Sequence, residues 1–247
     1  MIFLAGLLLH SMLITAQQRP VIEFRVTNAY VTYEAHETNL GSALKTVIGR
    51  NDDLSIKLLA SPESAAAKLM ISSSGFKTDR PMRDWSVKTL YLKSDKYPEI
   101  TFEILKIGGE SISKALRPLN KNVDIKADPQ NMTVDILIPD KENAPLVLRL
   151  GGEELLVDGK LREDILNAIN ADNGEIHVTG RLTVAGGAKD FDTAVAFKKI
   201  GNNEFVISAI INAAFTDFGM TAPNLSWFIA VHNKLILKGH AIIQVLK

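Results

Sequence analysis

The alternation of apolar and polar residues at every second position most constrains this fold. In residues 176–184, Ile176, Val178, Leu182 and Val184 alternate mainly with polar side chains. Successive side chains of a strand point to opposite faces, so this period predicts strands with one apolar and one solvated face. The same period recurs in residues 54–60, 100–104, 134–138, 191–197, 205–211 and 227–231. Many short strands and few helices predict an antiparallel β-barrel or sandwich.

Glycine and asparagine residues mark the expected connections between strands. Asn202 and Asn203, which follow Gly201, predict a hairpin turn between two of the alternating segments. Residues 236–245 predict one or two final strands, in which Gly239 would be a bend or a bulge.

Two short helices are expected. Pro81 suits a first helical turn, with Asp79 as its N-cap, and Asp84 would support the helix from a position four residues before Lys88. The second helix is predicted in residues 161–169, where apolar residues recur with a spacing of four and an Asp-Asn-Gly sequence follows.

Three segments of the chain together resemble a known family. Residues 76–102 read FKTDRPMRDWSVKTLYLKSDKYPEITF, residues 180–189 read GRLTVAGGAK, and residues 216–220 read TDFGM. These segments resemble stretches of the YceI-like family, and they occur in the order in which the family carries them. The resemblance implies a lipocalin-like antiparallel barrel that holds a long apolar lipid, typically a polyisoprenoid, and it implies no enzymatic activity.

The chain departs from the family pattern at three places. The turn that the family usually writes as Gly-Val-Thr-Lys is Gly-Gly-Ala-Lys at residues 186–189. The basic residue that often stands two positions before the Asp of the last segment is Phe215 here. Residues 108–174 are longer than the family usually allows. We interpret them as an insertion that elaborates a single domain spanning residues 17–247.

The resemblance and the strand pattern together give a set of expected ligand contacts. Inward-facing apolar side chains should line one elongated cavity, with the helix that carries Trp85 covering part of one end. Arg80 and Arg83 are candidates for contacts to an anionic head group, or they flank the helix in solvent. The expected lining residues are Trp85, Ile100, Phe102, Ile104, Val178, Leu182, Val195, Phe197, Phe218 and Trp227.

Strand alternation alone leaves the barrel interior undecided. A closed sheet of about eight strands is either filled by its own side chains or open enough for one slender ligand. Burial of apolar chain contributes roughly 0.8 kcal/mol per methylene, so an open barrel would bind a long lipid tail without any catalytic group.

The N-terminal residues predict a secretory signal. Residues 2–14 are almost wholly apolar and are followed by Thr15 and Ala16, so we expect residues 1–16 to be a signal peptide cleaved after Ala16. The apolar run is shorter than the roughly 20 residues that a membrane span needs. This prediction places the protein in the periplasm or outside the cell. The alternative is an N-terminal helix packed on the domain.

Composition argues against several other functions. The chain has no Cys, which excludes disulfides and thiolate chemistry, and its 28 basic residues equal its 28 acidic residues. Without a basic face a nucleic-acid partner is not expected. The five His residues show no metal-binding spacing, and no nucleophile motif or cofactor-binding loop is present. Neither a metal nor a cofactor is therefore expected.

Three functions remain open from the sequence. The first is a carrier that binds a long-chain lipid or isoprenoid in the barrel. The second is a filled barrel that contacts another envelope protein through residues 108–174. The third is a hydrolase of unrecognised type, for which no nucleophile and base can be placed.

Overall fold

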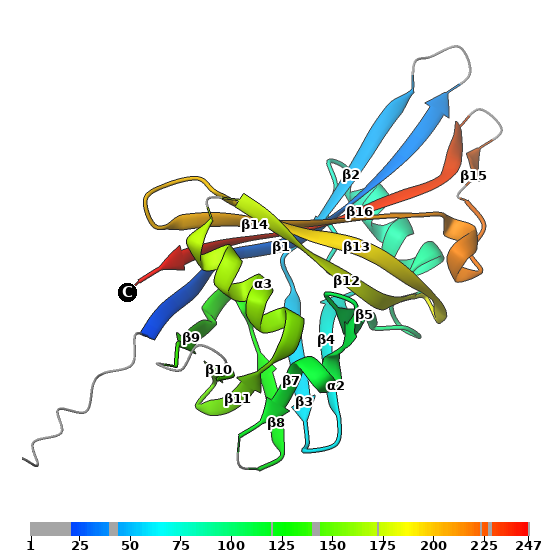
Figure 1. The fold of residues 1–247 in the computed structure, drawn as a ribbon. Coiled ribbons are helices and arrows are strands. Elements are labelled where there is room, and N and C mark those ends of the chain that lie inside the picture. The colour runs from blue at the N-terminus through cyan, green and yellow to red at the C-terminus, as the bar shows by residue number, and fades with distance from the viewer. Residues whose placement is uncertain are drawn as a thin grey trace, which may run out of the picture.

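The computed structural model describes residues 21–39, 44–119, 121–139, 144–171, 173–222, 224–226 and 229–246. The predicted signal peptide, residues 1–16, lies outside them. The strands form one antiparallel sheet that curls into a nearly closed barrel (Figure 1). The predicted fold class, an antiparallel barrel with few short helices, is confirmed.

Within the described residues, nine strands form the barrel wall. Strand β2 pairs with β1. The other eight strands follow one another in the sheet in the order β3-β4-β5-β12-β13-β14-β16-β1. The strands are β1 (Val21–Asn39), β2 (Lys45–Asn51), β3 (Leu54–Ala60), β4 (Ala65–Ser72), β5 (Glu99–Ile107), β12 (Asn173–Val184), β13 (Gly187–Lys199), β14 (Glu204–Ala213) and β16 (Ile229–Val245). The short strand β15 (Asn224–Ser226) pairs with β16.

The longest strand, β1, pairs with three other strands, which lie along its two edges. One edge pairs with β16, from Phe24 opposite Val245 to Asn39 opposite Ile229. The other edge pairs first with β9 (Thr133–Leu137) and then with β2. Between these two partners, the backbone N–H of Ala29 donates to Oε1 of Gln130 at 3.0 Å, and the Gln130 amide donates back to the Ala29 carbonyl. The Gln130 side chain thereby satisfies the backbone groups of Ala29 at a point where this edge of β1 has no partner strand.

The predicted strands and the hairpin turn at residues 201–203 are confirmed, except at Gly239 and at Trp227. Residues 236–245 are the second half of the continuous strand β16. Gly239 stands in regular register opposite both Val31 and Ala209, so this residue forms no bulge. Trp227 lies outside the described residues.

The first predicted helix exists, but its capping differs from the prediction. It runs as α1 (Pro81–Ser86) and continues as the π-helix η1 (Val87–Tyr91), with Arg80 at the N-cap rather than Asp79. The Asp84 carboxylate accepts hydrogen bonds from the backbone N–H and the hydroxyl of Thr78, at 2.7 and 2.6 Å. Asp84 therefore fixes the chain that enters the helix, a role that its spacing from Lys88 did not indicate.

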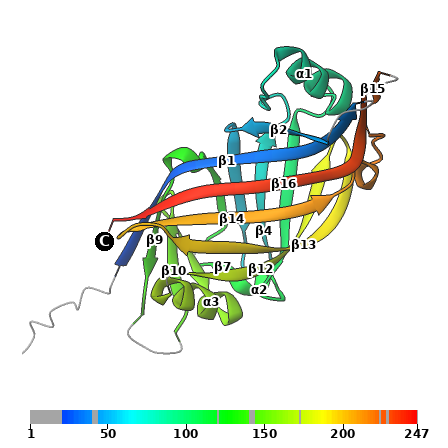
Figure 2. The ribbon, with the colours of Figure 1, turned by 90° about the horizontal axis from the view of Figure 1, so that it is seen from above.

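Residues 108–174 extend the same sheet and enclose a second core. Strand β8 pairs with β3, and β9 pairs with β1. The elements are β6 (Glu110–Ser111), α2 (Ile112–Ala115), β7 (Leu116–Pro118), β8 (Val123–Ala127), η2 (Pro129–Asn131), β9, β10 (Leu146–Leu150), β11 (Glu153–Val157) and α3 (Gly159–Asn170). Helix α3 contains the predicted residues 161–169. Seen from above, α1 and α3 lie on opposite sides of the molecule (Figure 2).

Candidate functional site

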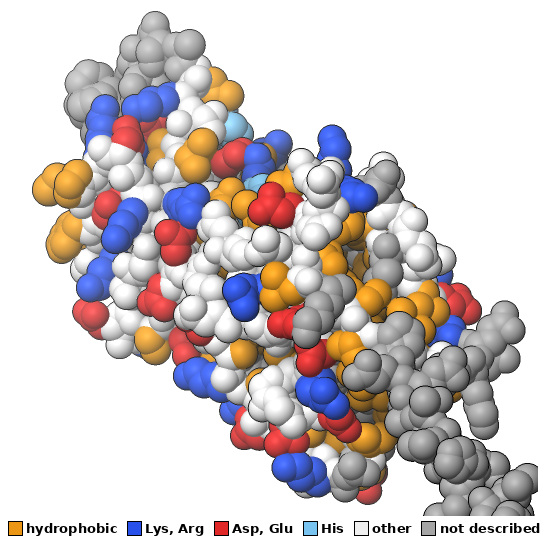
Figure 3. Space-filling model, turned by 90° about the vertical axis from the view of Figure 1, so that its left-hand side faces the viewer, with side chains coloured by type: hydrophobic (Ala, Val, Ile, Leu, Met, Phe, Trp, Pro, Cys, Tyr) orange, Lys and Arg blue, Asp and Glu red, His pale blue; other side chains and the backbone are white. Residues whose placement is uncertain are grey.

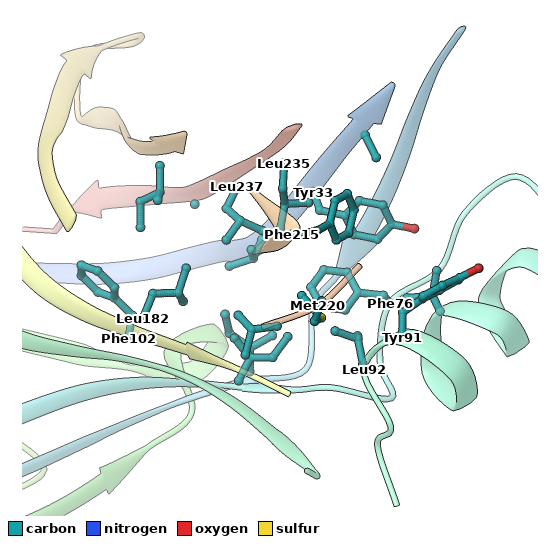
Figure 4. Close-up of a pocket in the computed structure, with 18 of the residues that line it drawn as sticks. Tyr33, Phe76, Tyr91, Leu92, Phe102, Leu182, Phe215, Met220, Leu235 and Leu237 are labelled. Carbon is teal, nitrogen blue, oxygen red and sulfur yellow. The ribbon is translucent and has the colours of Figure 1, made fainter. Parts of the chain in front are cut away.

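The barrel encloses a cavity of about 660 Å³. All nine strands of the wall contribute residues to it, and most of these side chains are apolar. One lining residue from each strand illustrates this: Tyr33, Val47, Ile56, Leu69, Phe102, Leu182, Val195, Ile211 and Leu237. Residues of α1 and η1 line the cavity at one end (Figure 4).

Two inward-facing glycines show where the interior is filled and where it is open. A Cβ at Gly180 would lie 2.2 Å from Cζ of Phe102, whose ring therefore uses the space that a side chain would take. A Cβ at Gly239 would meet no atom within 4 Å, and this residue lines the cavity. The absence of a side chain at residue 239 thus leaves cavity volume unfilled.

Paired charges surround the end of the cavity beside α1. The Glu37 carboxylate, with a side chain only 7% exposed, lies 3.7 Å from Nη2 of Arg83 and 3.9 Å from Nζ of Lys45. Arg83 also forms an ion pair with Asp79, which lies 3.8 Å from Nε of Arg80. Burial of a carboxylate is costly unless a cation compensates it, so Arg83 and Lys45 stabilise Glu37 in this position.

Two phenols add neutral polar groups at the same end. Tyr33 and Tyr91 both line the cavity, and their hydroxyl oxygens lie on the side where Figure 4 shows the helical segment. Burial raises the pKa of Tyr33 to about 12, and burial also raises the pKa of Tyr91. Both groups are therefore uncharged hydrogen-bond donors near neutral pH.

The three segments with family resemblance meet at one end of the barrel, where a Cβ at Gly186 would lie 2.7 Å from Cε1 of Tyr97. Nζ of Lys189 lies 2.7 Å from Asp217, which also accepts a hydrogen bond from the backbone N–H of Ala214 at 2.9 Å. These two donors hold the pKa of Asp217 below its usual range. A Cβ at Gly187 would lie 2.2 Å from the carbonyl oxygen of Phe218, so only glycine permits this contact. The segments with family resemblance therefore form this end of the barrel.

The structure brings most of the predicted ligand contacts together. Ile100, Phe102, Ile104, Val178, Leu182, Val195, Arg80 and Arg83 line the cavity. Arg83 is engaged by Asp79 and Glu37 rather than free in solvent.

Three predicted contacts lie elsewhere. Trp85 is 55% exposed and does not line the cavity. The Phe197 ring covers Gly174 on the neighbouring strand instead. Phe218 is buried in the barrel core, with its ring 6.2 Å from that of Phe191.

Sequence reasoning missed several lining residues on β1 and in the loops. Val31, Tyr33 and Ala35 alternate with the polar Thr32 and Glu34, so a signal with a period of two was present. The small side chain of Ala35 and the charge of Glu37 weaken this periodic signal. Phe76, Leu92 and Phe215 come from irregular segments or a short 3₁₀ turn, which leave no periodic signal.

Other sites are not evident in the described part of the chain. There, His, Asp and Glu side chains form no group of three that could hold a metal ion. No helix in these ranges is long and apolar enough to cross a membrane. On the face shown in Figure 3, Lys and Arg are interspersed with Asp and Glu rather than gathered into one charged patch.

Three solved structures similar to this chain share little sequence with it. BcnA of Burkholderia cenocepacia is 13% identical (TM-score 0.46; 87% of this chain and 95% of that chain covered). A polyisoprenoid binding domain from Saccharophagus degradans, implicated in plant cell wall breakdown, is 10% identical (0.47; 91% and 98%). The Campylobacter jejuni YceI protein is 14% identical (0.40; 81% and 84%).

Family membership rests on a match to a sequence model. Comparison with curated proteins gave no match. The model of the YceI-like domain, in contrast, matches residues 23–241, which is most of the chain. The protein belongs to the YceI-like family.

Proposed function

We propose that this protein binds a long-chain apolar lipid inside the barrel and performs no chemistry on it. The observation that carries the proposal is the apolar-lined cavity of about 660 Å³, within the size range of ligand pockets. Inward-facing residues of all nine wall strands contribute to it, and the open space at Gly239 extends it.

The energetics favour a long slender ligand. Each buried methylene contributes about 0.8 kcal/mol, so a tail of about fifteen carbons gains on the order of 12 kcal/mol. Association costs roughly 4–15 kcal/mol in lost freedom, so short tails would bind weakly and long tails tightly. A polyisoprenoid, the ligand that the resemblance implies, is such a chain.

The proposed setting is the periplasm or the extracellular space. It rests on the apolar residues 2–14 and the small residue at Ala16, which predict export of the mature chain. In an aqueous compartment a long lipid needs an apolar container, which the barrel would supply for storage or transport.

Native mass spectrometry of the full chain, purified without detergent, tests the proposal. We expect an adduct with the mass of a long-chain lipid. Gly239→Leu should abolish it, because the new side chain enters the open cavity. Gly201→Leu is the matched control: a Cβ at this turn residue makes ordinary contacts of 3.6 Å and more with Glu204, outside the cavity.

Two results would reject lipid binding. One is wild-type protein that remains folded, carries no lipid and takes none up from a lipid extract. The other is an adduct that Gly239→Leu retains at wild-type level. The first result would favour the alternative of a barrel that acts as an envelope protein-interaction module, for which residues 108–174 offer the added surface.

A further inference from the structure

The helical segment formed by α1 and η1 presents its large apolar side chains to solvent. Met82, Trp85 and Leu90 are 78%, 55% and 52% exposed. The polar residues Arg83 and Asp84, in contrast, are less exposed and bind other residues of the protein. A surface helix normally turns its apolar side toward the protein and its polar side toward water. This segment has the reverse arrangement, so its apolar face lacks a partner within the described part of the chain.

The exposed apolar residues are grouped rather than scattered. Met82 and Trp85 stand three residues apart in α1, a spacing that places side chains next to each other on a helix. Leu90 extends the apolar surface into η1. Single exposed apolar residues are common on proteins, whereas grouped ones mark contacts with a partner or a membrane.

This apolar surface adjoins the end of the barrel cavity. Met82 lines the cavity although it is the most exposed of the three residues, and Val87 and Tyr91 of the same helical segment also line it. One side of the segment therefore faces the cavity and the other faces solvent. Seen from above, α1 lies at the edge of the molecule, where a large flat surface could reach it (Figure 2).

The exposed charges of this part of the chain are mostly positive. Basic and acidic residues balance in the whole sequence, at 28 each. Apolar side chains flanked by Lys and Arg are typical of helices that lie in the plane of a bilayer surface, and anionic lipids attract such cations. Between residues 77 and 96, the exposed cations are Lys77, Arg80, Lys88, Lys93 and Lys96, and the exposed carboxylates are Asp79 and Asp95.

We propose that α1 and η1 dock the protein on the surface of an anionic lipid bilayer. Met82, Trp85 and Leu90 enter the interfacial layer, and the flanking cations contact the lipid head groups. The cavity end beside Met82 then lies against the bilayer. A second copy of the chain is a poorer occupant of this face, because it would bring a segment of the same positive charge. The docking goes beyond the proposed function and does not depend on a ligand in the cavity.

Flotation of the full chain with lipid vesicles tests the docking. The protein should float with vesicles of phosphatidylcholine and phosphatidylglycerol, and more weakly with phosphatidylcholine alone. The double variant Met82→Ser/Leu90→Ser should bind the anionic vesicles at least about tenfold more weakly, because it removes apolar area. Lys88→Glu should weaken the same binding by about tenfold through charge and leave the weak binding to phosphatidylcholine unchanged. All variants share the same N-terminal residues, so the differences among them report on the helical segment.

Ile200→Ser is the matched control. Ile200 is 52% exposed, as Leu90 is, but it lies in the turn between β13 and β14, away from α1 (Figure 2). This variant should float like the wild type. Gly239→Leu, which fills the cavity, should also float like the wild type, because docking uses the outer face of the helical segment. The substituted residues are exposed, so the melting temperatures of Met82→Ser/Leu90→Ser and Ile200→Ser should match that of the wild type.

Tryptophan fluorescence reports insertion directly. The chain has two tryptophans, so Trp227→Phe leaves Trp85 as the only one. Anionic vesicles should shift the Trp85 emission to shorter wavelength, and lipids brominated on their acyl chains should quench it, because the indole enters the apolar edge of the bilayer.

Several outcomes would overturn the docking. They are a wild type that does not float with anionic vesicles, equal flotation of Met82→Ser/Leu90→Ser, an equal loss in Ile200→Ser, and Trp85 emission that vesicles leave unchanged. Self-association that only the double variant abolishes, without vesicle binding, would assign this face to a second copy instead. Loss of flotation in Gly239→Leu would mean that the protein meets the bilayer through its cavity. A lipid adduct in a protein that does not dock would leave the proposed function standing while this inference fails.

Discussion

The barrel and the segment of residues 108–174 belong to one sheet, yet their interiors differ. The barrel encloses a cavity of about 660 Å³. The segment of residues 108–174 packs its strands around side chains such as Leu146 and Val157, both 0% exposed. Among the described residues, the buried polar side chains Glu37, Asn51, Ser73, Ser94 and Thr193 all lie outside this segment. Residues 108–174 therefore contribute to an apolar core, whereas the barrel retains open volume and buried polar groups.

The helices explain much of this difference. Helix α2 buries Ile112 and Ala115, and α3 buries Leu161, so both helices insert apolar side chains into the second core. Helix α1 and η1 bury none of their residues. They cover an end of the barrel without filling it. Whether a curled sheet holds a cavity thus depends on what closes it as well as on the alternation of its strands.

The largest expected contrast between the two regions is the cost of removing a leucine side chain. Leu146→Ala should lower the free energy of unfolding by about 3–5 kcal/mol, because it creates a new cavity in a filled core. Leu237→Ala should cost about 1–2 kcal/mol, because Leu237 already borders open space and loses fewer contacts. Urea unfolding of both variants measures the difference. Equal losses would mean that the barrel interior is as tightly filled as the core of residues 108–174.

The second contrast concerns the polar group inside the barrel. The pKa of Tyr33 is about 12 in the folded protein against an ordinary value of 10, so between these pH values the folded state holds a proton that the unfolded chain has released. Stability should fall as pH rises through this window, by roughly 2–3 kcal/mol. Tyr33→Phe lacks this contribution.

Unfolding free energies of both proteins from pH 9 to 12 test this expectation. Other groups also titrate in this range, so the relevant quantity is the wild-type loss minus the variant loss. Parallel curves would show that the Tyr33 phenol is solvated rather than buried, and that the open region is as wet as the surface.

The comparison of the two interiors shows which features could be predicted from the sequence. Alternation located the strands that carry Phe102, Leu182 and Val195, because a strand has one periodic signal and one buried face. It could not reveal that Gly239 faces empty space, since a glycine in a strand equally suits a bend, a bulge or a close contact. The ion pair between Glu37 and Arg83 joins residues far apart in the sequence, and no local pattern encodes it.

A glycine pair provides the third contrast, between filled and open positions in the barrel itself. Gly187→Ala should destabilise the protein by about 1–3 kcal/mol, because its Cβ would lie 2.2 Å from the backbone of Phe218. Gly239→Ala should be neutral or stabilising by about 0.5–1 kcal/mol, since alanine restricts the unfolded chain and meets open space. Thermal or urea unfolding measures both. A destabilising Gly239→Ala would show that side chains close the cavity there.

The smallest expected effect is the acid dependence of the barrel end. The hydrogen bonds from Lys189 and from the Ala214 backbone lower the pKa of Asp217. A carboxyl whose folded pKa is depressed contributes stability that is present above its unfolded pKa, about 3.9, and is lost as pH falls through the folded value. Asp217→Asn should therefore have a lower free energy of unfolding than the wild type at neutral pH. This difference should shrink below about pH 4. Lys189→Ala should retain part of the effect, because the Ala214 bond remains. Urea midpoints between pH 2 and 7 measure it. A difference that persists unchanged at pH 2 would mean that Asp217 holds this end by packing rather than by charge.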